Sequence, residues 1–363
     1  DMITAALSDH EFPARNIPQN IADLKAQLAA CEKGAQELSR LSKQYGLKTL
    51  HAYMGHVQDN AEATLKACLK ELNSGSFEYP MDDGSLIKVA ITINKERDEE
   101  SDTENCRAKV DFTGTSDQHA GNFIAPTSVA KAAVLYVFRC LVAKSMPLNA
   151  GFFRALDIVV PEGSMIAPQY PAAVVSGNVE TAQYIVDALL GALGIMAASQ
   201  GTNNNFTFGD EEFQYYETLC GGAGATKDND GASGVHSHMT NSRLTDVEIL
   251  EQRFPVMLEH FAIRPISGGA GEHKGGNGIE RHIRFLKSMS ATIISGHRQV
   301  PTFGMAGGNA GKVGMNFVQR FVLDQQGMPV PKLEFLQGCT DIQMYRGDVF
   351  CIHTPGGGGY GAV

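Results

Sequence analysis

The period with which apolar residues recur changes along the chain, and this change constrains the fold more than any other feature. Between residues 20 and 45 apolar side chains recur every three or four positions, as on one face of a helix, and a second helical pattern covers residues 47–72. From residue 87 onward, short runs alternate apolar and polar residues, as in strands with one buried face. We therefore expect an α+β fold that begins with a helical hairpin.

The middle of the chain contains both periods. Strands are expected at residues 87–93, 108–112 and 156–160. Two apolar helices are expected, one continuing from Pro126 to Val142 and one from Val179 to about Ala198. Both should be buried, because apolar residues cover most of their surface. This region is expected to be mixed α/β.

The last third of the chain is expected to be mainly β. Thr245 and Glu248 have the spacing of a capping box, which predicts a short helix that ends near Pro255. Strands are expected at residues 256–264, 281–286, 292–296, 316–323 and 348–353. The predicted organisation is a helical segment at 1–80, a mixed α/β domain with the candidate site at 81–253, and a mainly β region at 254–363.

Composition argues against several classes of function. The net charge of −10 is opposite to that of proteins which bind nucleic acid through Lys and Arg. No run approaches the roughly 18 apolar residues of a membrane helix, and the first residues lack a signal-peptide pattern, so we expect a cytoplasmic protein that does not bind membranes. The seven cysteines form no Cys-x-x-Cys pair, and Cys31, Cys68 and Cys140 are expected in the core.

Glycine is abundant, with 39 residues, and gathers in clusters. The runs at 267–271 and 275–278 neither open a helix nor contain Gly-Lys-Ser or Gly-Lys-Thr, so we expect tight turns between strands and not phosphate-binding loops. The run from Gly356 to Gly359 has two interpretations. It forms either a flexible tail or a closely packed backbone segment.

The densest polar region lies between residues 215 and 246. His236 and His238 are two positions apart, so on an extended segment both can reach one metal ion, phosphate or carbonyl oxygen. Asn241 and Arg243 follow, and these two residues are also two positions apart. We expect these four side chains to line one polar cavity, with Glu217 opposite. The alternative is that the imidazoles bind backbone groups in a buried loop.

A second polar group precedes the helix expected at 179–198. Asn178 and Glu180 lie at its start, where free backbone amides attract anions. The simpler alternative is that Asn178 caps the helix and Glu180 favours its first turn. The run Asn203 to Asn205 is likewise either part of a site or a turn.

Six separated motifs are more specific than any of these groups alone. They are His56–Glu62, Asp111–Thr115, Pro147–Gly151, Ser176–Thr181, His238–Arg243 and Pro355–Gly361. In this order they resemble the hydantoinase B / 5-oxoprolinase family. The segments at 80–84 and 214–222 make the 5-oxoprolinase branch the most similar.

The resemblance implies a hydrolase, a component of an ATP-dependent cyclic amidohydrolase. A hydantoinase A type partner, separate or fused, would use ATP to phosphorylate the oxygen of a small cyclic amide, and this chain would supply the chamber where the ring is hydrolysed. Members of this family carry, upstream of the part that this chain matches, a segment that resembles a divalent metal site for Mg or Mn. We therefore assign no metal ligand here and expect the isolated fragment to be inactive. An oligomer is expected.

Within this framework the catalytic candidates are His236, His238 and Glu217. The substrate-binding candidates are Asn178, Glu180, Asn241 and Arg243. We expect Arg243 or one histidine to hold an anionic group, because guanidinium donors suit carboxylates and phosphates, and the other histidine to move a proton.

Two alternatives remain open. The first is a subunit of an acetone or acetophenone carboxylase type ligase, which the resemblance also includes. The second is a scaffold that keeps the fold without catalysis. Release of glutamate against consumption of bicarbonate would separate the two kinds of enzyme.

Overall fold

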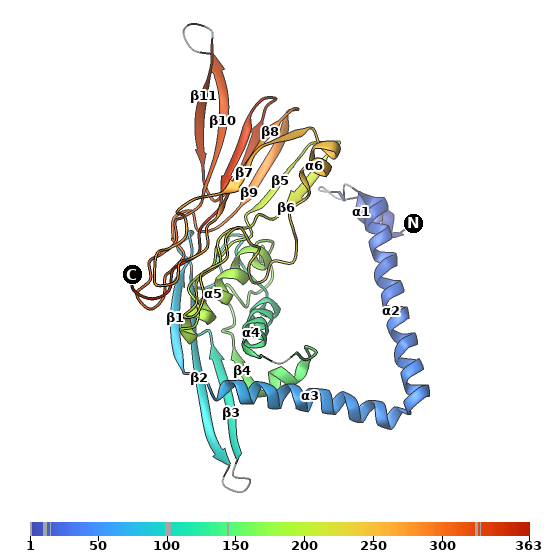
Figure 1. Cartoon of the computed structure of the whole chain (residues 1–363). Coiled ribbons are helices and arrows are strands. Elements are labelled where there is room, and N and C mark those ends of the chain that lie inside the picture. The colour runs from blue at the N-terminus through green and yellow to red at the C-terminus, as the bar shows by residue number, and fades with distance from the viewer. Residues whose placement is uncertain are drawn as a thin grey trace. The chain divides into compact units, whose positions relative to one another are not determined.

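The chain contains helices and three sheets in a mixed arrangement (Figure 1), which confirms the α+β prediction. The structure is a computed structural model that describes residues 2–9, 13–14, 16–98, 103–143, 145–323, 326 and 328–363. It forms two compact units, residues 1–61 and 62–363. The finer boundaries expected after residues 80 and 253 stay a prediction, although one sheet takes strands from both sides of residue 253.

The first unit is helical. It contains α1 (Met2–Ser8), α2 (Ile17–Tyr45) and most of α3 (Leu47–Leu69). The side chain of Asn16 accepts a hydrogen bond from the Gln19 amide at the start of α2, and Gly46, with φ of 82°, ends the helix. Both predicted helices are therefore present. In Figure 1 they diverge from Gly46, so they meet at their junction instead of packing side by side.

The cysteine prediction is wrong for two of three residues. Cys31 and Cys140 are exposed, and Cys68 is half-buried. Cys31 lies on α2, a helix without any buried residue, and Cys140 lies on the outer side of its helix. Periodic spacing alone did not reveal which face is covered. The buried cysteines are instead Cys106, Cys220 and Cys351.

The second unit begins with a four-stranded sheet in the order β1-β2-β3-β4. Its strands are β1 (Gly75–Pro80), β2 (Leu86–Asp98), β3 (Thr103–Asp111) and β4 (Leu156–Val159). The alternation in β2 buries Ile87, Val89 and Ile91 on one face, as predicted. Strand β1 was not predicted, because only Phe77 and Tyr79 alternate before Pro80 ends it.

Two helices cover this sheet. Helix α4 (Thr127–Leu141) packs against α5 (Ala182–Leu193), and α5 packs against β1 and β2 (Figure 1). A 3-10 turn, η1 (Ala150–Ala155), precedes β4. Helix α5 is buried almost all round, as expected, and ends at Gly194 in the left-handed conformation, before the predicted limit at Ala198.

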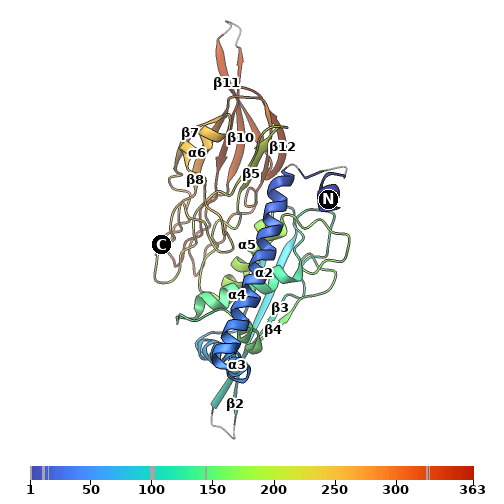
Figure 2. The same ribbon diagram turned by 90° about the vertical axis from the view of Figure 1, so that its right-hand side faces the viewer.

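The rest of the second unit is mainly β, as predicted. One sheet has the order β11-β10-β13-β8-β7 and the other β12-β9-β5-β6. The elements are β5 (Asn205–Gly209), β6 (Gln214–Glu217), α6 (Val247–Arg253), β7 (Val256–Ile263), β8 (Ile279–Phe285), β9 (Met289–Ile294), β10 (Met315–Leu323), β11 (Pro329–Leu336), β12 (Cys339–Met344) and β13 (Val349–His353). Strands β10 and β11 extend as a ribbon beyond the other strands (Figure 2).

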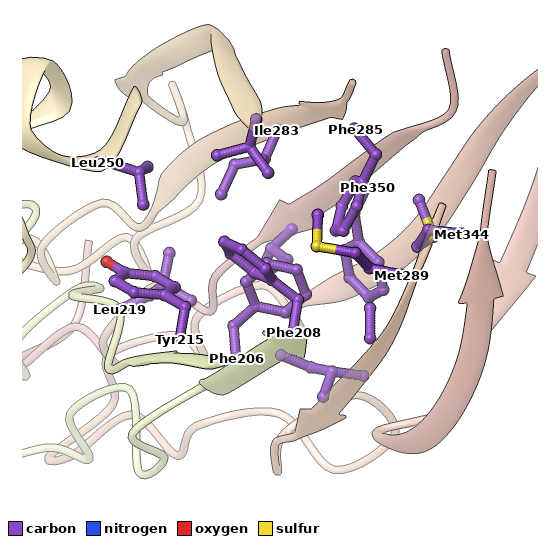
Figure 3. Packing of buried hydrophobic residues seen from close by; sticks show 14 of the residues in the cluster. Phe206, Phe208, Tyr215, Leu219, Leu250, Ile283, Phe285, Met289, Met344 and Phe350 are labelled. Carbon is purple, nitrogen blue, oxygen red and sulfur yellow. The ribbon is translucent and has the colours of Figure 1, made fainter. Parts of the chain in front are cut away.

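Aromatic rings join these two sheets. Phe206 and Phe208 of β5 meet Phe350 and Phe285 of the facing sheet, with ring centroids 4.6 and 5.4 Å apart (Figure 3). All four side chains are buried, and each contributes about 1.5–3 kcal/mol of hydrophobic free energy. This cluster sets the spacing between the sheets.

The cap of α6 differs from the predicted capping box. Asp246, not Thr245, is the N-cap, and its carboxylate accepts a hydrogen bond from the Glu248 amide at 3.2 Å. The helix therefore begins one residue later than the predicted box requires, and Glu248 takes part through its backbone.

The glycine clusters form a layer of packed backbone. Residues 264–278 are a long connection and not a tight turn, and Gly276 donates a hydrogen bond to the Ala223 carbonyl while Gly357 donates one to the Gly276 carbonyl. A Cβ on Gly357 would lie 2.0 Å from the Ala223 oxygen, and one on Gly222 would lie 2.0 Å from the Gly276 oxygen. The segment Gly356 to Gly359 is buried, so it is closely packed and not a flexible tail.

We predict that Gly357→Val lowers the free energy of unfolding by about 3 kcal/mol or more, because rigid backbone occupies the space its side chain needs. Gly163→Ala is the control. Gly163 has open space around its Cβ position and a φ of 78°, so only the backbone cost of about 1–2 kcal/mol applies. Urea denaturation of the three proteins measures both losses. Equal losses would show that the glycine layer can yield.

Candidate active site

A buried polar network lies along one side of α5. The π-helical turn Gly177–Thr181 leads into α5, and Glu180, Gln183 and Asp187 follow at helical spacing. All three side chains are fully buried. Charged and amide groups are costly to bury unless partners compensate them. The partners come from three segments, residues 199–204, 236–240 and 296–298.

Glu180 is the acidic centre of one half of the network. Its Oε1 accepts hydrogen bonds from the Thr202 hydroxyl at 2.8 Å and the Asn203 amide at 3.3 Å. Its Oε2 has no hydrogen-bond partner among the described residues and lies beside Gly296, where a Cβ would come within 3.2 Å. Burial raises the pKa of the Glu180 carboxyl to about 8, although these hydrogen bonds and the charge of Arg298 oppose the rise. Glu180 is therefore mostly protonated at pH 7.

Arg298 closes this half of the network. Its guanidinium donates to the Gly296 carbonyl at 2.6 Å, to Asn204 Oδ1 at 2.8 Å and to Asn316 Oδ1 at 3.0 Å. Burial lowers its pKa to about 10, so it keeps its charge at neutral pH. Asp82 accepts the backbone amide of Arg298 at 2.6 Å and that of Val300 at 2.8 Å. The β1–β2 turn is thereby bound to the loop that carries Arg298.

His297 lies next to Arg298 and is held by two tyrosines and a backbone carbonyl. Its ring stacks on Tyr184 with centroids 4.5 Å apart, its Nδ1 lies 2.7 Å from the Val300 carbonyl, and its Nε2 lies 3.2 Å from the Tyr79 hydroxyl. Since a carbonyl only accepts, Nδ1 carries the hydrogen, and Tyr79 donates to Nε2. Burial lowers the pKa of His297, so the ring is neutral.

The other half is centred on Asp187 and His238. His238 is 6% exposed, and its Nε2 lies 3.2 Å from Asp187 Oδ1, without the alignment of a hydrogen bond. Its Nδ1 faces the Tyr136 hydroxyl of α4 at 3.4 Å. Asp187 Oδ1 also accepts the Ser199 amide at 3.2 Å. A carboxylate, an imidazole and a phenol therefore lie in succession, and the imidazole is hydrogen-bonded to the phenol.

Amide groups connect the part of the network around Asp187 and His238 to Glu180. Gln183 Nε2 donates to Asn203 Oδ1 at 2.7 Å and to the Thr240 hydroxyl at 2.9 Å, and Thr240 donates to Asn203 Oδ1 at 2.8 Å. Asn203 thus joins the segment after α5 to the segment that follows His238. The Asn203 to Asn205 run belongs to the network and is not only a turn.

Backbone strain concentrates in this network. Five non-glycine residues among those described have a positive φ, and three of them are Asn204 (45°), His238 (48°) and His297 (54°). Such conformations cost about 1–3 kcal/mol each and are typical of functional sites. The side chains of these three residues are oriented at the expense of stability.

The predicted residues separate into groups. His238 and Glu180 lie in the network. His236 is half-buried, and its Nδ1 has no hydrogen-bond partner among the described residues. Burial, and secondarily the charge of Arg243, lower the pKa of His236, so it is neutral at pH 7. Asn241 and Arg243 are exposed.

Asn178 and Glu217 lie elsewhere. Asn178 is exposed within the π-helical turn, and the N-cap of this turn is Ser176. Both oxygens of Glu217 bind buried Arg281, at 2.9 and 3.0 Å, and Oε2 also accepts from the Tyr215 hydroxyl at 2.8 Å. A carboxylate so fully engaged suits an internal ion pair better than attack on a substrate. Its predicted catalytic role stays a prediction.

Several members of the network were not predicted. Asp82, Tyr136, Asp187, His297 and Arg298 carried no motif that reasoning from residue types could recognise. One signal was available for Asp187, since a lone acid within an apolar helix must be paired or protonated. His297 and Arg298 also depend on distant partners, because Tyr184 and Asn204 lie 113 and 94 residues away from them in sequence.

No metal centre is formed by these groups. Among the described residues, no three His, Cys, Asp or Glu side chains are arranged to hold a metal ion. Within the same residues, no helix combines the length and apolar character needed to span a membrane.

Comparison with known proteins identifies the family. The family model described as hydantoinase B/oxoprolinase matches residues 1–363. This chain belongs to the hydantoinase B/oxoprolinase family. The chain is 42% identical over 364 residues to a protein named 5-oxoprolinase 1 from Arabidopsis thaliana, covering 96% of this chain and 28% of that protein. It therefore spans little more than a quarter of that family member.

Solved structures confirm the fold. An ATP-dependent caprolactamase from Pseudomonas jessenii superposes with a TM-score of 0.76 at 22% identity, over 100% of this chain and 64% of that one. The nucleotide-free structure of an acetone carboxylase also has a TM-score of 0.76, at 16% identity, over 94% of this chain and 52% of that one. At these identities the likeness concerns the fold alone. The family's α+β architecture is thus shared by proteins named for different reactions.

We predict that Glu180→Gln changes how stability depends on pH. Because the folded pKa of about 8 is above the ordinary 4.5, Glu180 stabilises the fold most below pH 4.5 and this contribution is lost as pH rises through 8. The wild type should lose up to about 5 kcal/mol relative to the variant between pH 5 and 9. Urea denaturation at pH 5, 7 and 9 measures the difference.

Glu78→Gln is the matched control. Glu78 is 56% exposed and pairs with Lys88 on the surface, so its variant should follow the wild type at every pH. If the Glu180→Gln variant differs from the wild type by the same amount at all three pH values, Glu180 is not a buried neutral acid.

Proposed function

We propose that this chain is the hydrolytic component of an ATP-dependent cyclic amidohydrolase, of 5-oxoprolinase or hydantoinase B type. The observation that carries the proposal is the 42% identity to 5-oxoprolinase 1 over 96% of the chain, in which the segments of the buried network lie. Because the chain covers 28% of that protein, ATP binding is assigned to a hydantoinase A type partner or fused domain. The divalent metal is assigned upstream, and a cytoplasmic oligomer is expected.

The proposed reaction has two stages. At the partner, the γ-phosphoryl group of ATP is transferred to the ring amide oxygen, and ADP leaves. In this chain, one water adds to the activated carbon, the ring carbon–nitrogen bond breaks and the nitrogen takes a proton, which leaves an acyl phosphate. A second water then hydrolyses the acyl phosphate to the carboxylate and free phosphate. The protein must therefore accept a proton from water and supply one to nitrogen.

We assign these two tasks to the two histidines. Both ring nitrogens of His238 face protein groups, Asp187 and Tyr136. A proton therefore reaches His238 through Tyr136. To His236, which is neutral and whose buried Nδ1 has no partner in the described residues, we assign the role of the base that takes the proton of water. Arg243, whose charge contributes to lowering the pKa of His236, is proposed to hold the phosphoryl or carboxylate group. Asn178 and Asn241 are proposed to contact the substrate.

Substitution in the complete enzyme, with its ATP-binding partner present, tests these roles. We expect His238→Ala and His236→Ala each to lower turnover at least about a hundredfold while ATP binding persists. Tyr136→Phe keeps the ring and removes the hydroxyl, so it should slow turnover with little change in melting temperature. His260→Ala, at a side chain 42% exposed on β7, is the control. Near wild-type turnover of His238→Ala would make that histidine structural, and so would loss of folding.

Product analysis separates the alternatives. With ATP and 5-oxo-L-proline the complete enzyme should release glutamate, and with a hydantoin the carbamoyl amino acid. The acetone carboxylase likeness favours one second candidate, a ketone carboxylase, which would consume bicarbonate instead. A scaffold would release neither product, and the three substitutions would have no turnover to reduce.

A further inference from the structure

Helix α2 of the first unit carries an exposed line of apolar side chains. The helix is continuous from Ile17 to Tyr45 (Figure 1), and none of its 29 residues is buried. Along it, residues on one side recur at alternating intervals of four and three positions, and all of them except Ser42 are apolar. This apolar seam consists of Ile17, Ile21, Leu24, Leu28, Cys31, Ala35, Leu38, Ser42 and Tyr45.

The spacing of the apolar seam indicates what kind of surface covers it. Apolar residues at the first and fourth positions of a strict seven-residue repeat form a narrow line that packs against a second helix, as in coiled coils. A helix that lies on a membrane has a wider apolar face bordered by Lys and Arg. Between residues 20 and 39 the seam is instead bordered by Lys25, Glu32 and Ser39 on one edge and by Asn20, Gln27 and Gly34 on the other. The apolar seam therefore fits another helix.

The two sides of α2 differ in how far their side chains are already engaged. On the seam, Leu28 is 71% exposed and Leu38 is 50% exposed. On the outer side, Glu37 pairs with Lys33 and with Arg40, both at 2.8 Å. Contiguous exposed apolar side chains are typical of interaction surfaces. The partner of α2 is therefore expected on the seam and not on the charged outer side.

The charges beside the seam show that a second copy of α2 is a complementary partner. Lys25 and Glu32 each directly follow a seam residue, so they lie on the same edge, two helical turns apart. When two copies of α2 run antiparallel with Leu28 opposite Cys31, Lys25 of each copy lies across the seam from Glu32 of the other. The twofold axis thus creates two pairs of opposite charge.

Other alignments of two α2 helices lack these pairs. Sliding the antiparallel helices by seven residues in one direction places Glu32 opposite Glu32, and sliding them in the other direction places Lys25 opposite Lys25. In a parallel pair, Lys25 lies across the seam from Asn20, and Glu32 lies across from Gln27, so no opposite charges meet. Charge complementarity therefore favours one antiparallel register.

We propose that two copies of this chain associate through their α2 helices, which pair antiparallel with Lys25 of each copy opposite Glu32 of the other. In this register Leu24 faces Ala35, so a large side chain packs against a small one. The surface uses none of the side chains assigned to hydrolysis, and association is measured without substrate. Failure of the proposed reaction therefore leaves the pairing standing, and the reverse also holds.

Sedimentation equilibrium of the whole chain tests the occupant of the seam. We expect reversible dimers with a Kd of about 10 µM or lower. Leu28→Glu places a charge inside the seam and should weaken association at least about tenfold. Ala26→Glu is the matched control, because Ala26 is also exposed but lies on the outer side of α2. A chain that stays monomeric at about 100 µM has another occupant on its seam, and the proposal then fails. A dimer that Leu28→Glu weakens no more than Ala26→Glu does would also overturn it.

Charge reversal tests the antiparallel register. At about 0.05 M salt, where exposed charges are weakly screened, Lys25→Glu and Glu32→Lys should each weaken the dimer about tenfold, because each places like charges across the seam at both pairs. The double variant Lys25→Glu/Glu32→Lys restores opposite charges and should recover the wild-type Kd to within about threefold. A parallel pair would respond to neither reversal, so unchanged association of both single variants contradicts the proposal.

The side chains changed in these variants are all exposed, so each variant is expected to fold. Melting temperatures establish this before sedimentation. If Leu28→Glu does not fold, the two charge reversals and their combination still decide. Failure of the double variant to recover association, when both single variants are weakened, shows that Lys25 and Glu32 do not face each other and overturns the register.

Discussion

The burial of three polar side chains on α5 and on the π-helical turn that leads into it is the constraint on which the rest of the second unit depends. Glu180 lies in the π-helical turn, and Gln183 and Asp187 lie on the mostly apolar helix α5; all three are buried, so each requires a partner from another segment. Those requirements bring residues 199–204, 236–240 and 296–298 to one side of the helix. The network thereby joins the helix-covered sheet to the β-rich part of the unit, and Asp82 adds the β1–β2 turn.

The same interactions explain why the network resembles a site and not a stabilising core. A stabilising core would avoid positive φ at Asn204, His238 and His297, and it would leave no buried polar atom without a partner. Here strain, a neutral buried acid and neutral imidazoles occur together. Such groups can exchange protons near neutral pH, which a set of exposed charges does less readily.

The elements that the sequence predicted correctly are those with a regular local pattern of apolar residues. Helices α2 to α5 and strands such as β2, β7 and β10 were expected because their apolar residues repeat at one period over several turns or residues. Strand β11 was not, since Pro329 and Pro331 and its charged residues obscure any alternation. The cap of α6 was misplaced by one residue, because Thr245 and Asp246 are both good caps and only the backbone geometry decides between them.

The site was predictable only in part, for a physical reason. His238 and Glu180 were recognised from their neighbours in sequence, but their partners Tyr136, Thr202 and Arg298 are brought in by the fold. Glu217 was grouped with the histidines because it is near them in sequence, whereas its side chain pairs with Arg281 of β8. Distances along the chain predict contacts within an element, and they carry little information about contacts between sheets.

The layer of packed glycines has a consequence for how the chain is made. Gly356 to Gly359 contact the backbone of Ala198, Ala223, Gly269 and Phe303, segments synthesised much earlier. A ribosome adds residues from the N-terminus and holds the most recent ones in its exit tunnel. The loops around the buried network therefore cannot complete their packing until these glycines have left the tunnel. The second unit therefore completes its folding only after residues 356–359 have emerged, and its early loops must stay soluble while they wait for that segment.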